Sequence, residues 1–189
     1  MQKKIYAVLI IGFVVAISIS VMIIPIFFTK GISRTKLNKE FTLPMILSDE
    51  QDIELVFFGY SGCTDICMPK LFDIQKLYDT LEKNIKQKVG VIFVDISMPK
   101  DEELPQRFAE FFNIEFKGIY LNQTILRDYT KVFNVYFSQS LLENTEYDHT
   151  TNLYLVKKSK GKKEIRYIYN AYPYDIKQIK QDIKELRYE

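Results

Sequence analysis

The chain has 189 residues, of which 47% are hydrophobic, so it is long enough for one folded domain and an additional segment. Its formal net charge of +2 is too small for the concentrated basic face of a nucleic-acid-binding domain, so we expect no nucleic-acid partner. With 7 Gly, 6 Pro and no Ser- or Gly-rich stretch, the sequence shows no flexible linker that would divide it into two soluble domains.

An uncharged apolar run occupies residues 5–28, IYAVLIIGFVVAISISVMIIPIFF. As a helix it is long enough to span a hydrocarbon core of about 30 Å. A cleaved signal peptide is the alternative, but its apolar part is usually about 7 to 15 residues long and ends in a small-x-small cleavage site. Neither feature is present. We therefore expect residues 1–29 to form a transmembrane anchor and residues 30–189 to form the folded domain.

Basic residues flank this run on both sides, so charge alone does not define its orientation. A short N-terminus before a single span is readily kept inside while a large C-terminal domain is exported, and a pair of cysteines suits an oxidising compartment. We expect a single-pass protein of the cytoplasmic (inner) membrane. Its soluble domain would face the periplasm or the cell exterior.

Two continuous apolar runs, residues 54–60 and 89–96, predict buried strands, and apolar residues at helical spacing predict a helix over residues 69–85 between them. This alternation favours an α/β fold with parallel central strands, in the order of a thioredoxin-like fold. The other expected elements are a short apolar segment at 41–47, a helix at 101–112, a strand at 118–121, a helix at 125–133, a polar loop at 138–148, a hairpin of strands 153–157 and 164–170, and a helix after Pro173.

The two cysteines of the chain lie in FFGYSGCTDICMP, residues 57–69, directly after a predicted buried strand and at the entrance of the long helix. A thiol near a helix N-terminus is exposed to the positive end of the helix dipole, which favours the thiolate, the form that acts as nucleophile and metal ligand. Their spacing of four would direct both sulfurs to one face of a helical turn. Cys63 and Cys67 are therefore candidate redox-active thiols that can form a disulfide or bind a soft metal.

The single histidine of the chain, His149, immediately precedes the predicted strand at 153–157. In a thioredoxin-like fold, the loop before that strand faces the cysteine motif. A lone histidine is more often a surface residue without a function than a ligand. On residue type alone, both interpretations of His149 stay open.

The motif FGYSGCTDIC, followed far downstream by Asp-His-Thr and an apolar strand, resembles the signature of the Sco/SenC family of cytochrome-oxidase assembly proteins. The similarity extends over nearly the whole soluble part, from residue 41 to the terminal helix. It implies a thioredoxin-like fold in which Cys63, Cys67 and His149 bind copper as Cu(I) or Cu(II). Two thiolates and one imidazole suit Cu(I), and an added oxygen or nitrogen ligand accommodates Cu(II). Zinc is not excluded by ligand type, although a structural zinc usually takes four protein ligands.

Four further residues are relevant to the resemblance. Asp95 and Asp148 match acidic positions of the family, but the sequence does not define their roles. Thr64 and Met68 stand where the family commonly has proline. Met68 is more readily explained by packing than as a soft auxiliary ligand. These two departures bear on thiol potential, copper affinity and the partner surface.

The resemblance implies a metallochaperone more than an enzyme: a membrane-anchored protein that delivers copper, or helps insert it, into the dinuclear copper centre of a respiratory cytochrome c oxidase. Its partners would be the copper-accepting subunit of that oxidase and another copper chaperone or a thiol reductase. The alternative function is a thiol:disulfide reductase that acts on the cysteines of that centre or of another exported protein. A copper sensor uses the same ligands, and the sequence does not separate it from a copper chaperone. A structural disulfide and a peroxidase are weaker interpretations.

Overall fold

The computed structural model describes residues 34–42, 51–140, 146–159 and 162–189, together with helical positions 6, 10, 12–15, 17, 18 and 20. The chain divides into two compact units, residues 1–32 and 33–189. Most of the predicted transmembrane run at 5–28 lies outside the described residues. Within the residues that are described, no helix combines the length and the apolar character needed to cross a membrane.

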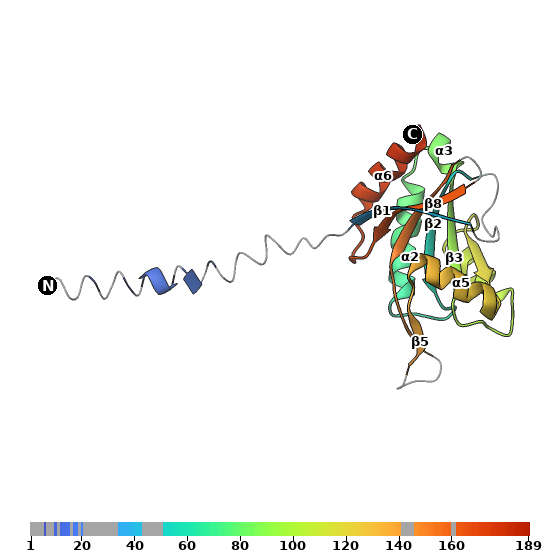
Figure 1. Ribbon diagram of the computed structural model, residues 1–189, viewed down its shortest axis with the longest axis horizontal. Helices are drawn as coiled ribbons and strands as arrows, with labels where there is room; N and C mark the ends of the chain where they lie inside the picture. Colours follow the sequence, from blue (N-terminus) through green and yellow to red (C-terminus); the bar gives the residue numbers. More distant parts are fainter. Residues whose placement is uncertain are drawn as a thin grey trace. The chain divides into compact units, whose positions relative to one another are not determined.

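A six-stranded mixed sheet forms the framework of the second unit, in the order β1-β8-β7-β2-β3-β4 (Figure 1). Strands β2, β3 and β4 are parallel, whereas β1, β8, β7 and β2 pair antiparallel, so the expected α/β fold with parallel central strands is confirmed. The strands of this sheet are β1 (Arg34–Phe41), β2 (Ile53–Gly59), β3 (Val89–Asp95), β4 (Lys117–Tyr120), β7 (Leu153–Ser159) and β8 (Lys162–Tyr169).

Helices cover both faces of the sheet, and this is why β2 and β3 are buried over their whole length. Along β2 the side chains alternate between two cores, so that Phe57 packs with α2, α4 and α6 while Phe58 packs with α5. The helices are α2 (Cys67–Asp79), α3 (Lys83–Lys86), α4 (Leu104–Phe112), α5 (Gln123–Phe133) and α6 (Ile176–Tyr188).

Three predicted helices differ from the observed ones at their ends, and the one expected at 125–133 begins two residues earlier, at Gln123. The helix expected over residues 69–85 begins two residues earlier, at Cys67, and ends at Asp79, because Thr80 turns the chain and donates its hydroxyl to the carbonyl of Leu77 at 2.8 Å. The helix expected from residue 101 begins at Leu104. The side chain of Asp101 accepts a hydrogen bond from a backbone N–H two residues later at 3.0 Å, which holds the preceding residues in a turn.

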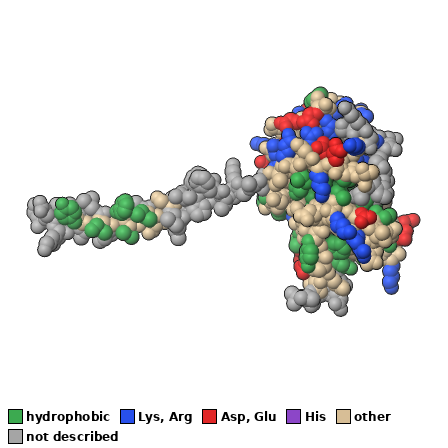
Figure 2. All heavy atoms as spheres, in the orientation of Figure 1, with side chains coloured by type: hydrophobic (Ala, Val, Ile, Leu, Met, Phe, Trp, Pro, Cys, Tyr) green, Lys and Arg blue, Asp and Glu red, His purple; other side chains and the backbone are tan. Residues whose placement is uncertain are grey.

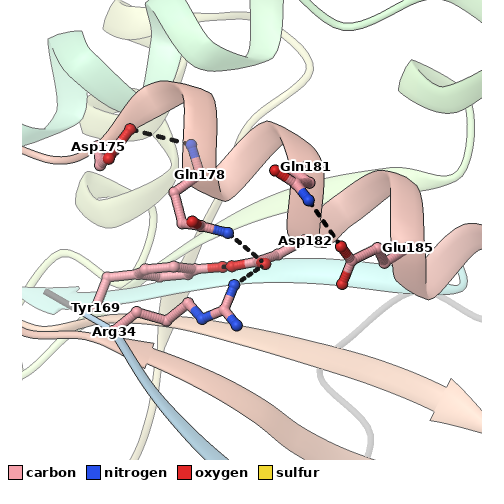
Figure 3. Close-up of polar contacts among 7 residues, drawn as sticks. All are labelled: Arg34, Tyr169, Asp175, Gln178, Gln181, Asp182 and Glu185. Atoms are coloured by element: carbon pink, nitrogen blue, oxygen red, sulfur yellow. Dashed lines mark hydrogen bonds and ion pairs between the residues drawn. The ribbon is translucent and has the colours of Figure 1, made fainter. Parts of the chain in front are cut away.

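Strand β1 was not expected, because its sequence is polar and most of its side chains are exposed at the edge of the sheet. Besides its pairing with β8, it is attached through Arg34, which forms an ion pair with the fully buried Asp182 of α6 (Figure 3). Asp182 also accepts hydrogen bonds from the hydroxyl of Tyr169 at 2.7 Å and from the side chain of Gln178 at 3.0 Å. This network joins β1, β8 and α6.

The polar loop expected at residues 138–148 is partly a hairpin, which corrects that prediction. Strand β5 (Phe137–Gln139) pairs antiparallel with β6 (Tyr147–His149) in a separate two-stranded sheet. Three residue pairs are too few to produce a pattern in the sequence. Of the apolar segment expected at 41–47, Phe41 ends β1, and positions 43–47 lie outside the described residues.

Charged side chains of both signs lie close together on the face of the second unit that Figure 2 shows. Lys and Arg side chains alternate there with Asp and Glu side chains. This distribution accords with the formal net charge of only +2.

Candidate metal centre

The two cysteines lie where β2 passes into α2, at the carboxyl end of a fully buried strand. Cys63 is in the turn between these elements, and Cys67 is the first residue of α2. Cys63 therefore precedes the helix and does not share a helical turn with Cys67, although the two sulfurs converge as the spacing predicted. The backbone N–H of Cys67 donates to the sulfur of Cys63 at 3.2 Å, so this sulfur satisfies an N–H group at the start of the helix. The N–H of Cys63 in turn donates to the carbonyl of Tyr60 at 3.1 Å.

His149 comes from β6 and completes a group with the two cysteines. The two sulfurs and one imidazole nitrogen all lie within 4.8 Å of one another, and the sulfur of Cys67 is 3.6 Å from Nε2 of His149. The other ring nitrogen, Nδ1, is 3.0 Å from the carbonyl oxygen of Thr150. When Nδ1 carries the proton and donates it to this carbonyl, the lone pair of Nε2 faces the sulfurs, as a metal ligand requires.

An aromatic side chain that the sequence did not single out supports the imidazole. The ring of Tyr60 meets that of His149 edge to face, with centroids 6.0 Å apart, and packs against Tyr147 at 5.4 Å. Beside these rings is a hollow of about 340 Å³ whose lining includes Cys63 and His149 but not Cys67. The group is therefore open on the side of Cys63 and His149.

Asp95 organises the cysteine loop without belonging to the group of metal-ligating atoms. It is fully buried at the end of β3. One carboxylate oxygen accepts from the N–H and hydroxyl of Ser61 at 2.8 and 2.5 Å, and the other accepts from the N–H and hydroxyl of Ser97 at 2.7 and 2.6 Å. The carboxylate thus ties the loop that follows β2 to the loop that follows β3.

The remaining residues singled out in the sequence lie outside the group of metal-ligating atoms. Met68 is partly buried and packs against the hydrophobic core, in agreement with a packing role. Asp148 is exposed at the rim of the hollow, and Thr64 donates its hydroxyl to a carboxylate oxygen of Asp65 at 3.0 Å. Gly59 is a further residue that the site needs, because a Cβ there would lie 3.0 Å from the sulfur of Cys67.

The cysteines are not bonded to each other and differ in their affinity for protons. The thiol of Cys67 donates a hydrogen bond to Cys63, and this bond, with hydrogen bonds from backbone N–H groups at the start of α2, lowers the pKa of Cys63 to about 4 against the effect of burial. The same hydrogen bond, together with burial, raises the pKa of Cys67 well above its usual range. The metal-free pair is therefore a thiolate beside a thiol. Metal binding would release the remaining proton.

The donor set fits a soft metal ion. Two sulfurs and one imidazole nitrogen converge, and no carboxylate of the described residues belongs to the group. Thiolate ligands favour soft ions such as Cu(I), whereas Mg²⁺ and Ca²⁺ prefer oxygen ligands. The arrangement is open on the side of the hollow.

Together, the fold and the site define a thioredoxin-like α/β protein that carries a centre of two cysteines and one histidine. The family model described as SCO1/SenC matches residues 50–187, and the chain belongs to this family. A SCO2-like protein of Rickettsia prowazekii is 26% identical over 114 residues, which are 57% of this chain and 54% of that protein. Protein sco1 of Schizosaccharomyces pombe is 31% identical over 87 residues, 44% of this chain and 32% of that protein. The chain thus matches about half or less of the length of these curated relatives.

Solved structures show the same fold. Apo Sco1 of Thermus thermophilus superimposes with a TM-score of 0.63 at 23% identity, over 84% of this chain and 95% of that one. Yeast Sco1 with copper bound superimposes with a TM-score of 0.60 at 19% identity, over 82% of this chain and 90% of that one. At this level of identity, the likeness establishes the fold.

Proposed function

We propose that this protein binds copper through Cys63, Cys67 and His149, and that it delivers copper, or helps insert it, into the dinuclear copper centre of a respiratory cytochrome c oxidase. The observation that carries the proposal is the convergence of the two sulfurs and the imidazole nitrogen within 4.8 Å. Membership of the SCO1/SenC family supports it. Sco proteins of yeast and Arabidopsis thaliana have been solved with copper bound.

The geometry suits a protein that both holds copper and gives it up. Two thiolates and a neutral imidazole supply three ligands for Cu(I), and a further ligand entering from the hollow would complete a site for Cu(II). Because Cys63 and His149 line the hollow, thiolates of an acceptor protein can approach the metal there. Exchange of ligands one at a time would then transfer the ion without releasing it to water.

The location and partners belong to the same proposal. Residues 1–29 would anchor the chain in the cytoplasmic (inner) membrane, with the folded domain in the periplasm or at the cell exterior. There it would meet the copper-accepting subunit of the oxidase. A second copper chaperone would supply the metal, or a thiol reductase would keep the cysteines reduced.

A second function, thiol:disulfide reduction, is favoured by the position of Cys63, which is not bonded to Cys67 and lines the hollow. The lowered pKa of Cys63 supports this function. The thiolate of Cys63 would attack a disulfide of the substrate protein and form a mixed disulfide, releasing one substrate thiolate. Cys67 would then lose its proton and attack the sulfur of Cys63, which breaks the mixed disulfide and releases the second substrate thiolate. The products are a reduced substrate and a Cys63–Cys67 disulfide, so two electrons pass to the substrate.

His149→Ala separates the two functions, because only copper binding uses the imidazole. We expect the variant to lose stoichiometric copper binding in competition with a chelator, while it still reduces a disulfide-bonded model peptide. Asp148→Ala is the matched control, since this neighbour is exposed and lies outside the group of ligands; it should bind copper as the unchanged protein does. Undiminished copper affinity in His149→Ala would refute the three-ligand site.

A further inference from the structure

Lys70 is a buried lysine one helical turn beyond Cys67 on α2, with 6% of its surface exposed. Its ammonium donates to the carbonyl oxygen of Thr151 at 2.9 Å and to the hydroxyl of the same residue. The ammonium also lies over the rings of Tyr172 and Tyr174, at 5.3 and 5.8 Å from their centroids. These contacts fix the charge at one place beside the cysteines.

The charges around Lys70 are unusual for a buried cation. Lys163, the other lysine buried among the described residues, has the carboxylate of Glu54 at 2.9 Å. Within the described part of the chain, no carboxylate forms an ion pair with Lys70. Burial lowers the pKa of Lys70, and the negative groups that counter this effect are Cys67 and Cys63. A buried charge requires compensation, and the negative charge of the cysteine pair provides it here.

This arrangement affects the two oxidation states of bound copper differently. With two thiolates and a neutral imidazole, the centre carries a net charge of about −1 as Cu(I) and about 0 as Cu(II). A fixed positive charge in a buried environment stabilises the more negative state. It also stabilises the reduced, metal-free pair, which carries one negative charge as a thiolate beside a thiol, relative to the uncharged disulfide.

We propose that Lys70 is a charge-balancing residue that biases the copper centre toward Cu(I) and the cysteine pair toward its reduced form. This inference rests on the proposed copper site. It adds a determinant of redox preference that lies outside the three ligands.

If Lys70 had a purely structural role, its loss would increase the preference of the site for Cu(I) instead of reducing it. Thr151 lies two residues beyond His149, so the hydrogen bonds of Lys70 also hold the segment that follows the imidazole. If Lys70 acted only by holding this segment, its loss would displace the imidazole. A site left with two thiolates discriminates further in favour of Cu(I), because imidazole is the ligand better suited to Cu(II). The direction in which the preference for Cu(I) over Cu(II) changes when Lys70 is replaced therefore distinguishes a role of its charge from a purely structural role.

The test compares four variants of the full chain. Lys70→Met removes the charge, Lys70→Gln removes it but keeps hydrogen-bond donors for Thr151, and Lys70→Arg keeps the charge. Lys76→Met is the matched control, because Lys76 lies on the same helix with its side chain 73% exposed. The dissociation constants of Cu(I) and Cu(II) are measured by chelator competition, and the disulfide potential is measured against a glutathione buffer without copper.

We expect Lys70→Met and Lys70→Gln to reduce the preference for Cu(I) over Cu(II) about tenfold, which lowers the copper potential by about 59 mV. Both should also lower the disulfide potential, while Lys70→Arg and Lys76→Met change neither. An unchanged or increased preference for Cu(I) in Lys70→Gln would overturn the inference while leaving copper binding intact. Absence of copper binding in the unchanged protein would instead refute the proposed function, and with it the copper part of the inference.

Discussion

Asp95 holds the loop of the candidate metal centre in place without contributing a ligand. Its carboxylate accepts four hydrogen bonds, two on each oxygen, from Ser61 and Ser97. The sequence predicted the ligands Cys63 and Cys67 because their rarity, spacing and position after a strand are all local properties. The role of Asp95 depends on which two loops the sheet brings together, and no local pattern contains that information.

Replacement of this carboxylate by an amide tests its role. Asp95→Asn keeps the size of the side chain but offers one acceptor oxygen instead of two and directs an amide N–H₂ toward an N–H donor. We expect a loss of about 2 kcal/mol in the free energy of unfolding, measured with urea. Asp148→Asn, an exposed change of the same kind, should cost less than about 0.5 kcal/mol. Equal effects of the two substitutions would contradict the role assigned to Asp95.

The lowered pKa of Cys63 predicts an unusual dependence of its reactivity on pH. In the reduced, metal-free protein, the thiolate of Cys63 persists down to a pH of about 4. Its rate of alkylation by iodoacetamide should therefore change little between pH 8 and pH 5, whereas an ordinary thiol becomes about tenfold slower per pH unit. Mass spectrometry locates the label, and Cys67, which does not line the hollow, should stay unmodified. A tenfold decline per unit at Cys63 would show that its pKa is not lowered.

At the scale of the elements, apolar patterns predicted the interior of the fold and failed at its edges. The runs that became β2 and β3 were recognised because both faces of these strands are buried, which requires a continuous apolar sequence. Strand β1 was missed because an exposed edge strand needs no such pattern and is defined by pairing with β8, far along the chain. The β5–β6 hairpin, which carries His149, was missed because its strands have only three residues.

A buried ion pair that joins β2 and β8 gives a prediction at this scale. Glu54 and Lys163 are both buried, with N–O distances of 2.9 and 3.0 Å. Lys163→Met should leave the carboxylate uncompensated and reduce the free energy of unfolding by about 3–5 kcal/mol at pH 8. Adding Glu54→Leu should restore most of the loss. Lys162→Met is the control, because Lys162 pairs with Glu40 at an exposed site.

The same pair makes stability depend on pH in a defined direction. Burial raises the pKa of Glu54 to about 7, although Lys163 opposes the shift. The folded protein then keeps a proton that the unfolded chain releases, so the contribution of Glu54 falls as pH rises from about 4.5 toward 7. Without Lys163 the pKa of Glu54 is higher still, so this fall extends to higher pH. Urea unfolding should therefore show the largest deficit of Lys163→Met at pH 8 and a smaller one at pH 5; a deficit independent of pH would exclude ionised Glu54 as its cause.

At the scale of the whole molecule, the division at residue 32 predicts which part of the chain folds independently. A protein that begins at residue 34 should unfold cooperatively, because it contains every strand of the main sheet. A protein that begins at residue 43 loses β1 and leaves Asp182 buried without Arg34, so we expect a loss of at least about 3 kcal/mol. Thermal unfolding of both proteins measures the difference, and Arg34→Met in the longer one should reproduce much of it. Equal melting temperatures would show that β1 contributes nothing to stability.

The sheet order also has a mechanical consequence. The chain enters the folded unit at β1, an edge strand, whereas the cysteines follow β2, and β8 and β7 lie between these two strands. A pull on the N-terminal segment is therefore first resisted by the β1–β8 ladder and by the contact of Arg34 with Asp182. Strand β2, which precedes the cysteines, bears the load only after the β1–β8 ladder and the Arg34–Asp182 contact have broken. The metal centre is thus insulated from strain that enters through the N-terminal segment.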